Sequence, residues 1–460
     1  MTIGNKENEF REIKIAYIGG GSRGWAWTLM NDLAKADDMS GCVFLYDIDF
    51  EAARHNEVIG NKVGSAWRYV AVKTIGEALT GADFVIISIL PATFDEMEYD
   101  VHAPEKYGIY QSVGDTTGPG GFFWAMRTVP MIREIARAIR EYCPDAWVIN
   151  YTNPMAVCVR TLYTEFPAIK AFGCCHEVFG TQKLLAQALA DIHGIKGATR
   201  SDICVNVVGV NHFTWFTSAH YKNINLFDTY KKFVDKYYES GFENGGHNNW
   251  ANNSFHSAAR VRFDLFRRFG YIAAAGDRHL AEFCNRDEYL ESPECVKKWM
   301  FGLTSVAWRK KDLQERLEKS AALLSGKETF RLHETGEEGV CQMRALLGGG
   351  KLVTNVNLPN RGQIPNLPLG SVVETNAVFA ADMLTPVVAG NLPESLYERI
   401  SRINRENDRT VEAAFSESLA NCFAVFSEGH LVQDLSEKQK ETLFHDMYEG
   451  TKKYLSTYKA

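Results

Sequence analysis

A glycine-rich turn between a buried strand and a helix sets the strongest limit on how this chain folds. The apolar run 14–18 ends in Gly-Gly-Gly-Ser-Arg-Gly at positions 19–24, and residues 25–36 follow with helical spacing. At such a junction glycine permits the tight turn, the close approach of a pyrophosphate and the packing of helix on strand. The free N–H groups at the start of the helix attract phosphate. We predict that this turn binds a dinucleotide, the alternative being a glycine turn without a ligand; the residues are Gly19, Gly21, Ser22 and Gly24.

An acidic residue follows at the distance that dinucleotide binding requires. Asp47 ends the second apolar run, 43–46, and lies 23 positions after Gly24. An acid placed about 20 residues after the turn accepts hydrogen bonds from a ribose hydroxyl. The same charge repels a 2′-phosphate, so Asp47 favours NAD over NADP. Asp49 is a competing candidate for this role.

The first 200 residues alternate between short apolar runs and helical segments. We expect strands at 14–18, 43–46, 83–90, 147–149 and 169–172, with helices at 25–36 and 122–142 between them. Strict alternation of this kind predicts an α/β fold with a doubly wound, Rossmann-like parallel sheet. After residue 202 the pattern changes: residues 203–210 and 213–219 favour paired antiparallel strands, whereas 254–269, 294–324 and most of the chain after 376 favour helices. We therefore expect a dinucleotide-binding domain over 1–200 and a mixed α/β substrate and metal domain over 201–460.

Composition excludes several classes of function. The 460 residues include 50 Lys and Arg against 57 Asp and Glu, a net charge of -7, which gives no basic surface for nucleic acid. No run approaches the roughly 20 apolar residues of a membrane span, and the first 12 residues are polar. Ten cysteines occur without a Cys-x-x-Cys pair, so most are expected to be free thiols. We expect a cytoplasmic protein that binds neither nucleic acid nor membrane.

Three polar loops follow predicted strands on the edge where a doubly wound sheet binds its ligands. The loop 114–121 is rich in glycine and carries Asp115, the loop 150–154 displays Asn153 before a proline, and the loop 173–178 contains Cys175 and His176. Each loop taken alone is equally well explained as a simple turn. Three such loops beside the dinucleotide turn favour a shared active site.

Cys175 and His212 form a candidate pair of metal ligands. A thiolate and a neutral imidazole suit a borderline divalent ion, and both residues follow predicted strands. The alternative for His212, which follows Asn211, is a structural histidine whose hydrogen bonds are satisfied inside the protein.

Taken together, these segments resemble glycoside hydrolase family 4. The resemblance runs from residue 13 to about 384 and is carried by five motifs in order: the glycine turn, Asn150-Tyr-Thr-Asn-Pro154, Cys175-His-Glu-Val178, Val210-Asn-His212 and Asn360-Arg-Gly-Gln-Ile-Pro-Asn-Leu-Pro368. It implies an NAD- and manganese-dependent glycosidase on a lactate/malate-dehydrogenase-like fold. The tetrad 175–178 is similar to that of the α-galacturonidase subgroup. Members that act on 6-phosphoglycosides carry Asp or Asn after the metal cysteine, so His176 argues against a phosphorylated substrate.

The resemblance also implies roles for individual residues. Cys175 and His212 match the ligands of Mn²⁺, Asn153 matches a substrate-binding residue, and Asp115 matches an active-site carboxylate. We count His176, within the subgroup tetrad, among the catalytic candidates. The segment 276–283 matches the region that supplies the catalytic base and has no Tyr; it offers, in order of preference, Asp277 and His279.

The implied reaction is hydrolysis of α-galacturonides. NAD oxidises C3 of the sugar, the metal assists removal of the C2 proton, the aglycone is eliminated, and water and hydride are then returned. A uronide or oligogalacturonide substrate requires a cationic group for its carboxylate, and Arg278 and Arg361 are candidates, with exposed surface arginines as the alternative. Other hypotheses are an NAD-dependent dehydrogenase of a hydroxy acid or sugar acid, and a catalytically inactive NAD-binding regulator. The resemblance further suggests a homodimer or homotetramer.

Overall fold

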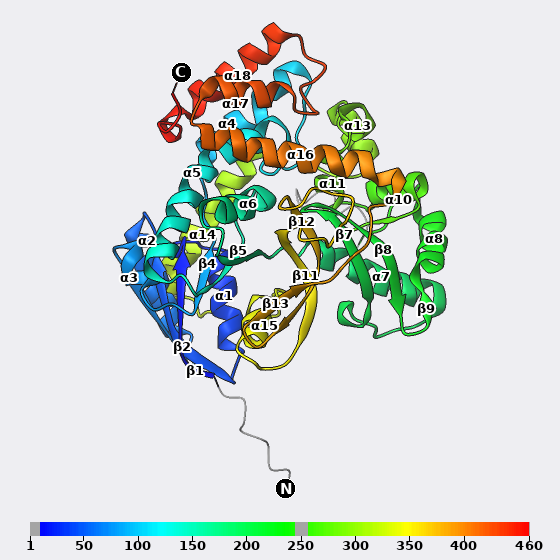
Figure 1. Cartoon of the computed structure of the whole chain (residues 1–460). Helices are drawn as coiled ribbons and strands as arrows, with labels where there is room; N and C mark the ends of the chain where they lie inside the picture. Colours follow the sequence, from blue (N-terminus) through cyan, green and yellow to red (C-terminus); the bar gives the residue numbers. More distant parts are fainter. Residues whose placement is uncertain (1–9, 244–255, 460) are drawn as a thin grey trace.

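A nine-stranded sheet forms the centre of the molecule (Figure 1). The structure is a computed structural model that describes residues 10–243 and 256–459. Six strands are parallel and run in the spatial order β3-β2-β1-β4-β5-β6, the order of a doubly wound dinucleotide-binding sheet, which confirms the predicted fold class. Five of them coincide with the predicted runs, and β3 was not predicted. Their bounds are β1 (Phe10–Ile18), β2 (Met39–Tyr46), β3 (Trp67–Val72), β4 (Phe84–Ile87), β5 (Trp147–Asn150) and β6 (Lys170–Gly173).

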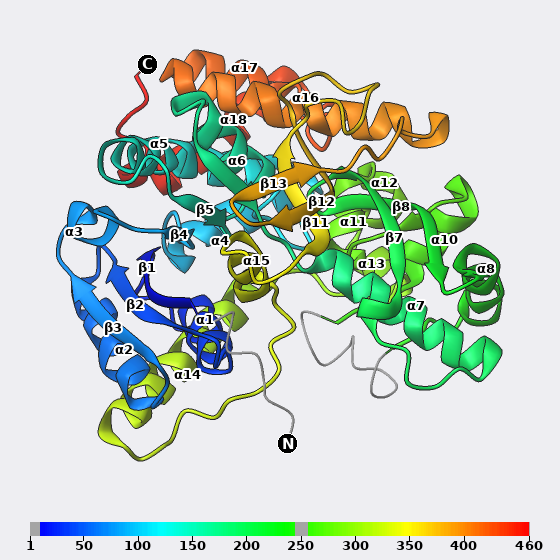
Figure 2. The same cartoon turned by 60° about the horizontal axis from the view of Figure 1, so that its bottom comes forward.

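Helices cover both faces of this sheet, because successive side chains of its buried strands point to opposite faces. On β1, Ile15 and Tyr17 belong to one apolar cluster, whereas Ala16 and Ile18 belong to another, with α3, α5 and α6. The first cluster includes residues of α1, α2, α14 (Val306–Ser325) and α15 (Gly339–Leu346). Figure 2 shows α14 beside α2, which it contacts. The helices of the first half are α1 (Trp25–Ala34), α2 (Phe50–Lys62), α3 (Ile75–Leu79), α4 (Phe94–His102), α5 (Gly118–Tyr142), α6 (Met155–Glu165) and α7 (Glu177–His193).

Three strands from the second half of the chain extend the same sheet. β11 (Leu352–Pro359) pairs antiparallel with β6, and β12 (Val372–Ala380) and β13 (Met383–Pro386) follow it outward. Residues 201–460, expected to form a second domain, therefore also supply three strands of the sheet that begins with β1. Helix prevails after residue 376, as expected, but residues 376–386 instead pair as strands with β11 and with each other.

A smaller antiparallel sheet lies beside this extension, at the right in Figure 1. β7 (Cys204–Val210) and β8 (Phe213–Tyr221) form the predicted hairpin, and β9 (Ile224–Asn225) and β10 (Ile272–Ala273) add to β8. The predicted helix over 254–269 begins at residue 260, its residues 254–255 lying outside the described part. The one over 294–324 divides into two. The helices here are α8 (Leu226–Tyr237), α10 (Arg260–Phe269), α11 (Asp277–Phe283), α12 (Arg286–Tyr289), α13 (Pro293–Lys298), α14 (Val306–Ser325) and α15 (Gly339–Leu346).

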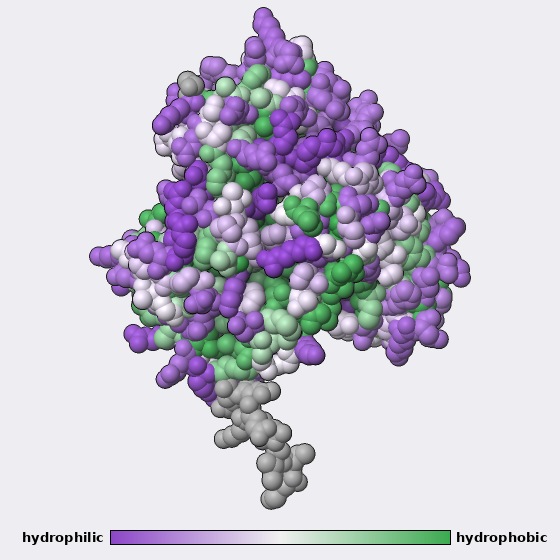
Figure 3. Space-filling view, viewed as in Figure 1, coloured by the Kyte–Doolittle hydropathy of each residue, from purple (hydrophilic) through white to green (hydrophobic). Residues whose placement is uncertain are grey.

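The chain ends in three helices packed on α4, α5 and α6: α16 (Glu394–Ser416), α17 (Leu419–Ser427) and α18 (Glu437–Thr451). They lie at the top of Figure 1 and contribute aromatic and aliphatic side chains to a cluster with the start of α5. Figure 3 shows hydrophilic residues over most of this face, with apolar residues in the middle of the view, where β11 and β12 lie in Figure 1. Within residues 10–243 and 256–459, no helix is long and apolar enough to cross a membrane.

A buried ion pair joins α4 to α5. Both side chains of Asp100 and Arg127 are fully buried, and the guanidinium donates to both carboxylate oxygens. Arg127 also donates to the backbone oxygen of Pro91, at 3.2 Å. Removing one member of such a pair leaves an uncompensated charge in the interior.

We therefore expect Asp100→Ala to lower the free energy of unfolding by about 3–5 kcal/mol, because Arg127 would keep its charge without a partner. Urea denaturation followed by circular dichroism measures the change. The matched control is Lys231→Ala, which removes an exposed pair with Asp235 and should change stability by less than about 1 kcal/mol. Equal effects of the two substitutions would contradict the prediction.

Candidate active site

The predicted dinucleotide turn is held tightly between β2 and β4. The backbone N–H groups of Gly19 and Gly20 both donate to the oxygen of Tyr46, and Gly19 has a φ of +95°. A Cβ on Gly19 would lie 2.0 Å from the backbone oxygen of Ser88, so this position requires glycine. Ser22 then accepts a hydrogen bond from the N–H of Trp25, at 3.2 Å, at the start of α1.

The structure separates the two acidic candidates that follow β2. One carboxylate oxygen of Asp47 accepts a hydrogen bond from the N–H of Gly21, at 2.8 Å, so this side chain lies against the turn. The side chain of Asp49 instead caps α2 by accepting from the N–H of Ala52. The geometry therefore favours Asp47 for the ribose.

Sequence analysis did not identify Asn56, which braces the same turn from α2. Its side-chain amide donates to the backbone oxygens of Gly20 and Ser22, at 2.7 and 2.9 Å, and accepts from the indole of Trp27. Two exposed apolar residues, Ile48 and Leu90, follow β2 and β4 at this edge, with 92% and 52% of their surface exposed. Polar and glycine motifs, on which the sequence analysis relied, could not identify Ile48 and Leu90 as exposed residues at this edge.

Cys175 and His212 come from different sheets, and a network of buried amides around Glu374 joins their segments. Asn355 donates to the backbone oxygen of Cys175 and to the Glu374 carboxylate, at 3.2 and 2.6 Å. Asn211 donates to the other oxygen of that carboxylate, at 3.2 Å. His212 follows in the two-residue turn between β7 and β8, with a φ of +64°, an uncommon conformation for a residue other than glycine. The structure thus links the segments of both predicted ligands through one carboxylate.

The electrostatics of the pair fit a divalent cation. Burial, with the carboxylates of Glu374 and Glu177 nearby, raises the pKa of the Cys175 thiol well above its usual range. Burial and the adjacent His279 ring hold the pKa of His212 well below its usual value, so the imidazole is neutral and keeps a lone pair. A bound cation would favour the thiolate form of Cys175 and so lower the pKa of this thiol. Among the residues that the structure describes, no three His, Cys, Asp or Glu side chains converge as ligands.

Glu177 and His279 form a partly buried pair close to His212. Nδ1 of His279 lies 3.4 Å from one oxygen of Glu177, whose other oxygen accepts from the N–H of Gly276 at 2.6 Å. The ring of His279 packs against that of His212 at an interplanar angle of 32°, with their centroids 3.9 Å apart. Burial alone would lower the pKa of His279, but the Glu177 carboxylate raises it overall. Of the two predicted bases, His279 is therefore the one that contacts a predicted metal ligand.

Asp277, the first choice for the base, has different contacts. Its side chain is completely buried and accepts from the N–H groups of Val261 and Arg262, at 3.2 and 3.3 Å, and from the Arg262 guanidinium. Both carboxylate oxygens thus fasten the start of α10 to the start of α11. These contacts do not support Asp277 as the base, and we do not retain it in that role.

The two candidate arginines lie at opposite ends of the sheet. Arg278 is buried next to the predicted site and donates to the backbone oxygens of Ser112 and Gly302 and to the hydroxyl of Thr304. Arg361 lies beyond the end of β11, which runs antiparallel to β6, and lines a pocket with residues at the amino ends of β5 and β6. The structure therefore does not bring Arg361 to the other candidates, and the prediction that it binds substrate is not retained.

The remaining candidates lie around the same edge. Asn153 follows β5, whose end pairs in parallel with that of β6, so its loop leaves the sheet beside the loop of Cys175. Asn153 precedes Pro154 in a cis peptide. Asp115 accepts a hydrogen bond from the neighbouring Thr116 hydroxyl, at 2.7 Å. His176 pairs through Nδ1 with Glu337, at 2.9 Å, and its side chain is 49% exposed.

Comparison with known proteins assigns the chain to a family. The model of the family 4 glycosyl hydrolases matches residues 14–191, and the model of the C-terminal domain of that family matches residues 207–431. The chain belongs to glycosyl hydrolase family 4. It is therefore a glycosidase, and this favours the glycosidase hypothesis over the hypothesis of an NAD-dependent dehydrogenase.

Several relatives match nearly the full length. An alpha-galacturonidase of Thermoanaerobacterium saccharolyticum is 60% identical over 98% of both chains, and one of Bacillus subtilis is 51% identical over 95% of this chain and 97% of the relative. A crystal structure of a Bacillus subtilis protein, 51% identical, has a TM-score of 0.92 over 95% of this chain and 100% of that one. A 6-phospho-alpha-glucosidase in complex with NAD and Mn²⁺, 17% identical, shares the fold with a TM-score of 0.80 over 97% of this chain and 100% of that one.

Glu282, another residue that sequence analysis missed, provides a test of the electrostatics. One of its oxygens accepts from the N–H groups of Val113 and Gly114, at 2.6 and 2.9 Å, and burial raises the pKa of this carboxyl to about 7. Between about pH 4.5 and 7 the unfolded chain has lost this proton while the folded chain keeps it. The stability that the proton contributes is thus complete below pH 4.5 and is lost as the pH rises to 7.

We expect Glu282→Gln to remove a slope of up to about 1.4 kcal/mol per pH unit from the free energy of unfolding across this window. Urea denaturation at several pH values between 4.5 and 7.5 measures it. Glu398→Gln, an exposed substitution on α16, is the matched control and should leave the slope unchanged. An unchanged slope in Glu282→Gln would show that Glu282 ionises normally in the folded protein.

Proposed function

We propose that this chain hydrolyses α-galacturonides with NAD and Mn²⁺ as cofactors. The observation that carries the proposal is that the segments of the buried Cys175 and His212 are linked through Glu374, and that Cys175 follows β6 at the edge of the parallel sheet where the dinucleotide turn follows β1. The alpha-galacturonidases at 51–60% identity over almost the whole chain support the substrate class. The structures of family members in complex with NAD and Mn²⁺ support the cofactors.

In this proposal the residues divide into two binding sets. Gly19, Gly21, Ser22, Gly24 and Asp47 bind NAD, while Cys175 and His212 bind the metal. When bound, NAD supplies reversible hydride transfer at C3 of the sugar, and Mn²⁺ supplies Lewis acidity to the sugar oxygens. Two protein ligands leave coordination positions open for those oxygens.

Around the sugar, His279 is the proposed general base for the C2 proton. Its Nδ1 faces the Glu177 carboxylate, which leaves Nε2 as the proton acceptor in the neutral ring. Because the carboxylate raises the pKa of the ring, His279 is a stronger base than an isolated imidazole, an arrangement suited to general base catalysis near neutral pH.

Four further residues contact the substrate in this proposal. We assign His176 to the aglycone side because it is half-exposed, whereas Cys175, His212 and His279 are largely buried. Asn153 and Asp115 bind sugar hydroxyls from the neighbouring loops, and Arg278 supplies the cationic group for the uronate carboxylate. The cytoplasmic location and the homodimer or homotetramer remain predictions.

The reaction is tested on cofactor-stripped protein with p-nitrophenyl α-galacturonide. We expect release of nitrophenol only when both NAD and Mn²⁺ are added, because neither cofactor alone completes the chemistry. Cys175→Ser should lose at least about 10²-fold in kcat/KM by losing the thiolate ligand. The exposed Cys204→Ser is the matched control. Release without either cofactor would overturn the mechanism, whereas activity only on the galactoside or a 6-phosphoglycoside would overturn the substrate class.

The base is tested by running the reaction in D₂O, where removal and return of the C2 proton places deuterium at C2 of the released uronate. We expect His279→Gln to lower kcat by about 10²–10⁴-fold together with deuterium incorporation. Asp277→Asn should mainly lower the melting temperature, because it weakens the contact between α10 and α11. Loss of exchange in Asp277→Asn at an unchanged melting temperature would instead identify Asp277 as the base.

A further inference from the structure

We propose that Thr116 is a positioning residue that orients His212 for metal binding, and that its loop is held in place from the C-terminal helices through Glu282, His430 and Glu406. The proposal rests on the proposed metal site at Cys175 and His212. In this proposal metal binding depends on a third residue besides the two ligands, because the Thr116 hydroxyl determines which ring nitrogen of His212 is free to bind the metal.

The hydrogen bonds of Thr116 determine the tautomer of His212. The Thr116 hydroxyl lies 2.7 Å from a carboxylate oxygen of Asp115 and 3.2 Å from Nδ1 of His212. A carboxylate can only accept, and a hydroxyl has a single proton, so Thr116 donates to Asp115 and accepts from Nδ1–H. In the neutral imidazole this places the lone pair on Nε2. A metal-binding histidine whose other nitrogen donates to a fixed partner is held in one tautomer and one orientation.

The loop that carries Thr116 is fastened along its length. Glu282 accepts from the N–H groups of Val113 and Gly114, as described above. The side chain of Gln111 accepts from the N–H of Gly120, at 2.9 Å, and donates to the backbone oxygen of Asp100, at 2.7 Å. Thr116 is therefore held between two anchored points, and its hydroxyl cannot follow a displaced imidazole freely.

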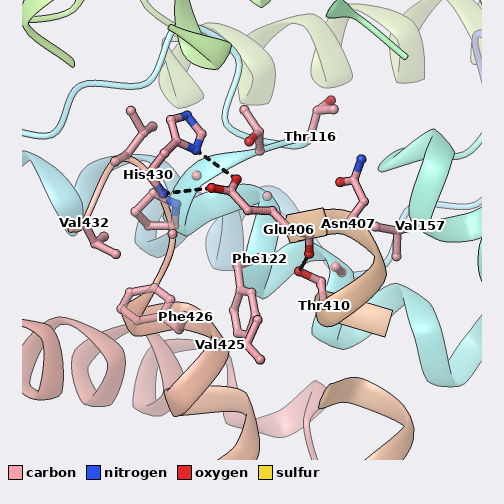
Figure 4. A pocket seen from close by; sticks show the side chains of 17 residues that line it. Thr116, Phe122, Val157, Glu406, Asn407, Thr410, Val425, Phe426, His430 and Val432 are labelled. Carbon is pink, nitrogen blue, oxygen red and sulfur yellow. Dashed lines mark hydrogen bonds and ion pairs between the residues drawn. The ribbon is translucent and has the colours of Figure 1, made fainter. Parts of the chain in front are cut away.

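The C-terminal part of the chain anchors Glu282 in turn. Nε2 of His430 lies 2.8 Å from the backbone oxygen of Glu282, and Nδ1 lies 3.0 Å from the carboxylate of Glu406 on α16. Both ring nitrogens of His430 therefore have hydrogen-bond partners inside the protein, one on α11 and one on α16. Figure 4 shows His430 and Glu406 across a pocket from Thr116. The His430 side chain is fully buried, which makes the anchor rigid.

These contacts form one continuous path from α16 to the metal ligand. Glu406 fixes His430, His430 fixes the end of α11, Glu282 fixes the loop, and Thr116 fixes His212. Loss of the Thr116 hydroxyl removes the partner of Nδ1 and allows the other tautomer, in which Nε2 carries the proton and cannot bind a metal. Substitutions of this kind cost about 10–100-fold in metal affinity.

The test measures Mn²⁺ binding to the full chain with saturating NAD, by the electron paramagnetic resonance signal of free Mn²⁺. We expect Thr116→Val to raise the Kd by about 10–100-fold and Thr116→Ser, which keeps the hydroxyl, to restore it to within about threefold. An unchanged Kd in Thr116→Val, or an equal loss in both variants, would overturn the positioning role. Undiminished Mn²⁺ binding in Cys175→Ser would instead overturn the metal site of the proposed function.

A second measurement reports on the tautomer itself. Long-range ¹H–¹⁵N spectra of the metal-free protein should show His212 with its proton on Nδ1, assigned by its loss in His212→Gln, and should show a shift toward Nε2–H in Thr116→Val. A proton already on Nε2 in the unsubstituted protein would overturn the proposal. For the anchor, His430→Gln should raise the Mn²⁺ Kd by less than about tenfold, whereas the exposed His220→Gln should leave it unchanged.

Discussion

The carboxylate of Glu374 holds the two halves of the site together. It lies on β12, accepts from Asn355 on the adjoining strand β11 and from Asn211 in the hairpin of the other sheet. Asn355 also donates to the backbone of Cys175. A buried carboxylate satisfied by amides from two sheets allows little relative movement, because each lost hydrogen bond would leave a polar group buried without a partner. The extension of the parallel sheet by β11 and β12 thus has a direct role: it brings this carboxylate between the segments of Cys175 and His212.

Local patterns predicted one part of this arrangement and could not predict the other. The glycine turn, Asp47, the parallel strands and the Cys175 segment are recognisable because their features lie within a few residues of one another. Glu374 and Asn211 are 163 residues apart, and Glu282 and Gly114 are 168 apart. Thr116 and His212 are separated by 96 residues. No periodicity connects such positions, so only the folded chain shows that these ordinary polar residues surround the site.

The positions of Asp277 and Arg361, which differ from those expected, have an equally physical origin. Successive residues of a helix point about 100° apart, so Asp277 and His279 face different neighbours although they share one short helix. Composition could not show which of the two faces His212, a predicted metal ligand. Arg361 follows a strand that runs opposite to β6, and Asn357 pairs with Gly173, so each further residue moves away from the ligand edge. The position of Arg361 thus follows from the direction of β11, which the sequence did not show.

The site is also electrostatically biased toward a cation. The pKa of Cys175 is raised by burial and the pKa of Glu374 is raised to about 7, so in this setting negative charge is unfavourable unless a positive charge is added. A divalent ion at Cys175 and His212 would remove that cost, and with two protein ligands it would share its remaining coordination positions with the oxygens of the sugar. Under the proposed function the metal and the substrate therefore stabilise each other by the same free energy, since such coupling is reciprocal. The hydrogen bond between Thr116 and His212 affects this coupling, because a misplaced His212 imidazole weakens metal binding and, through the metal, sugar binding.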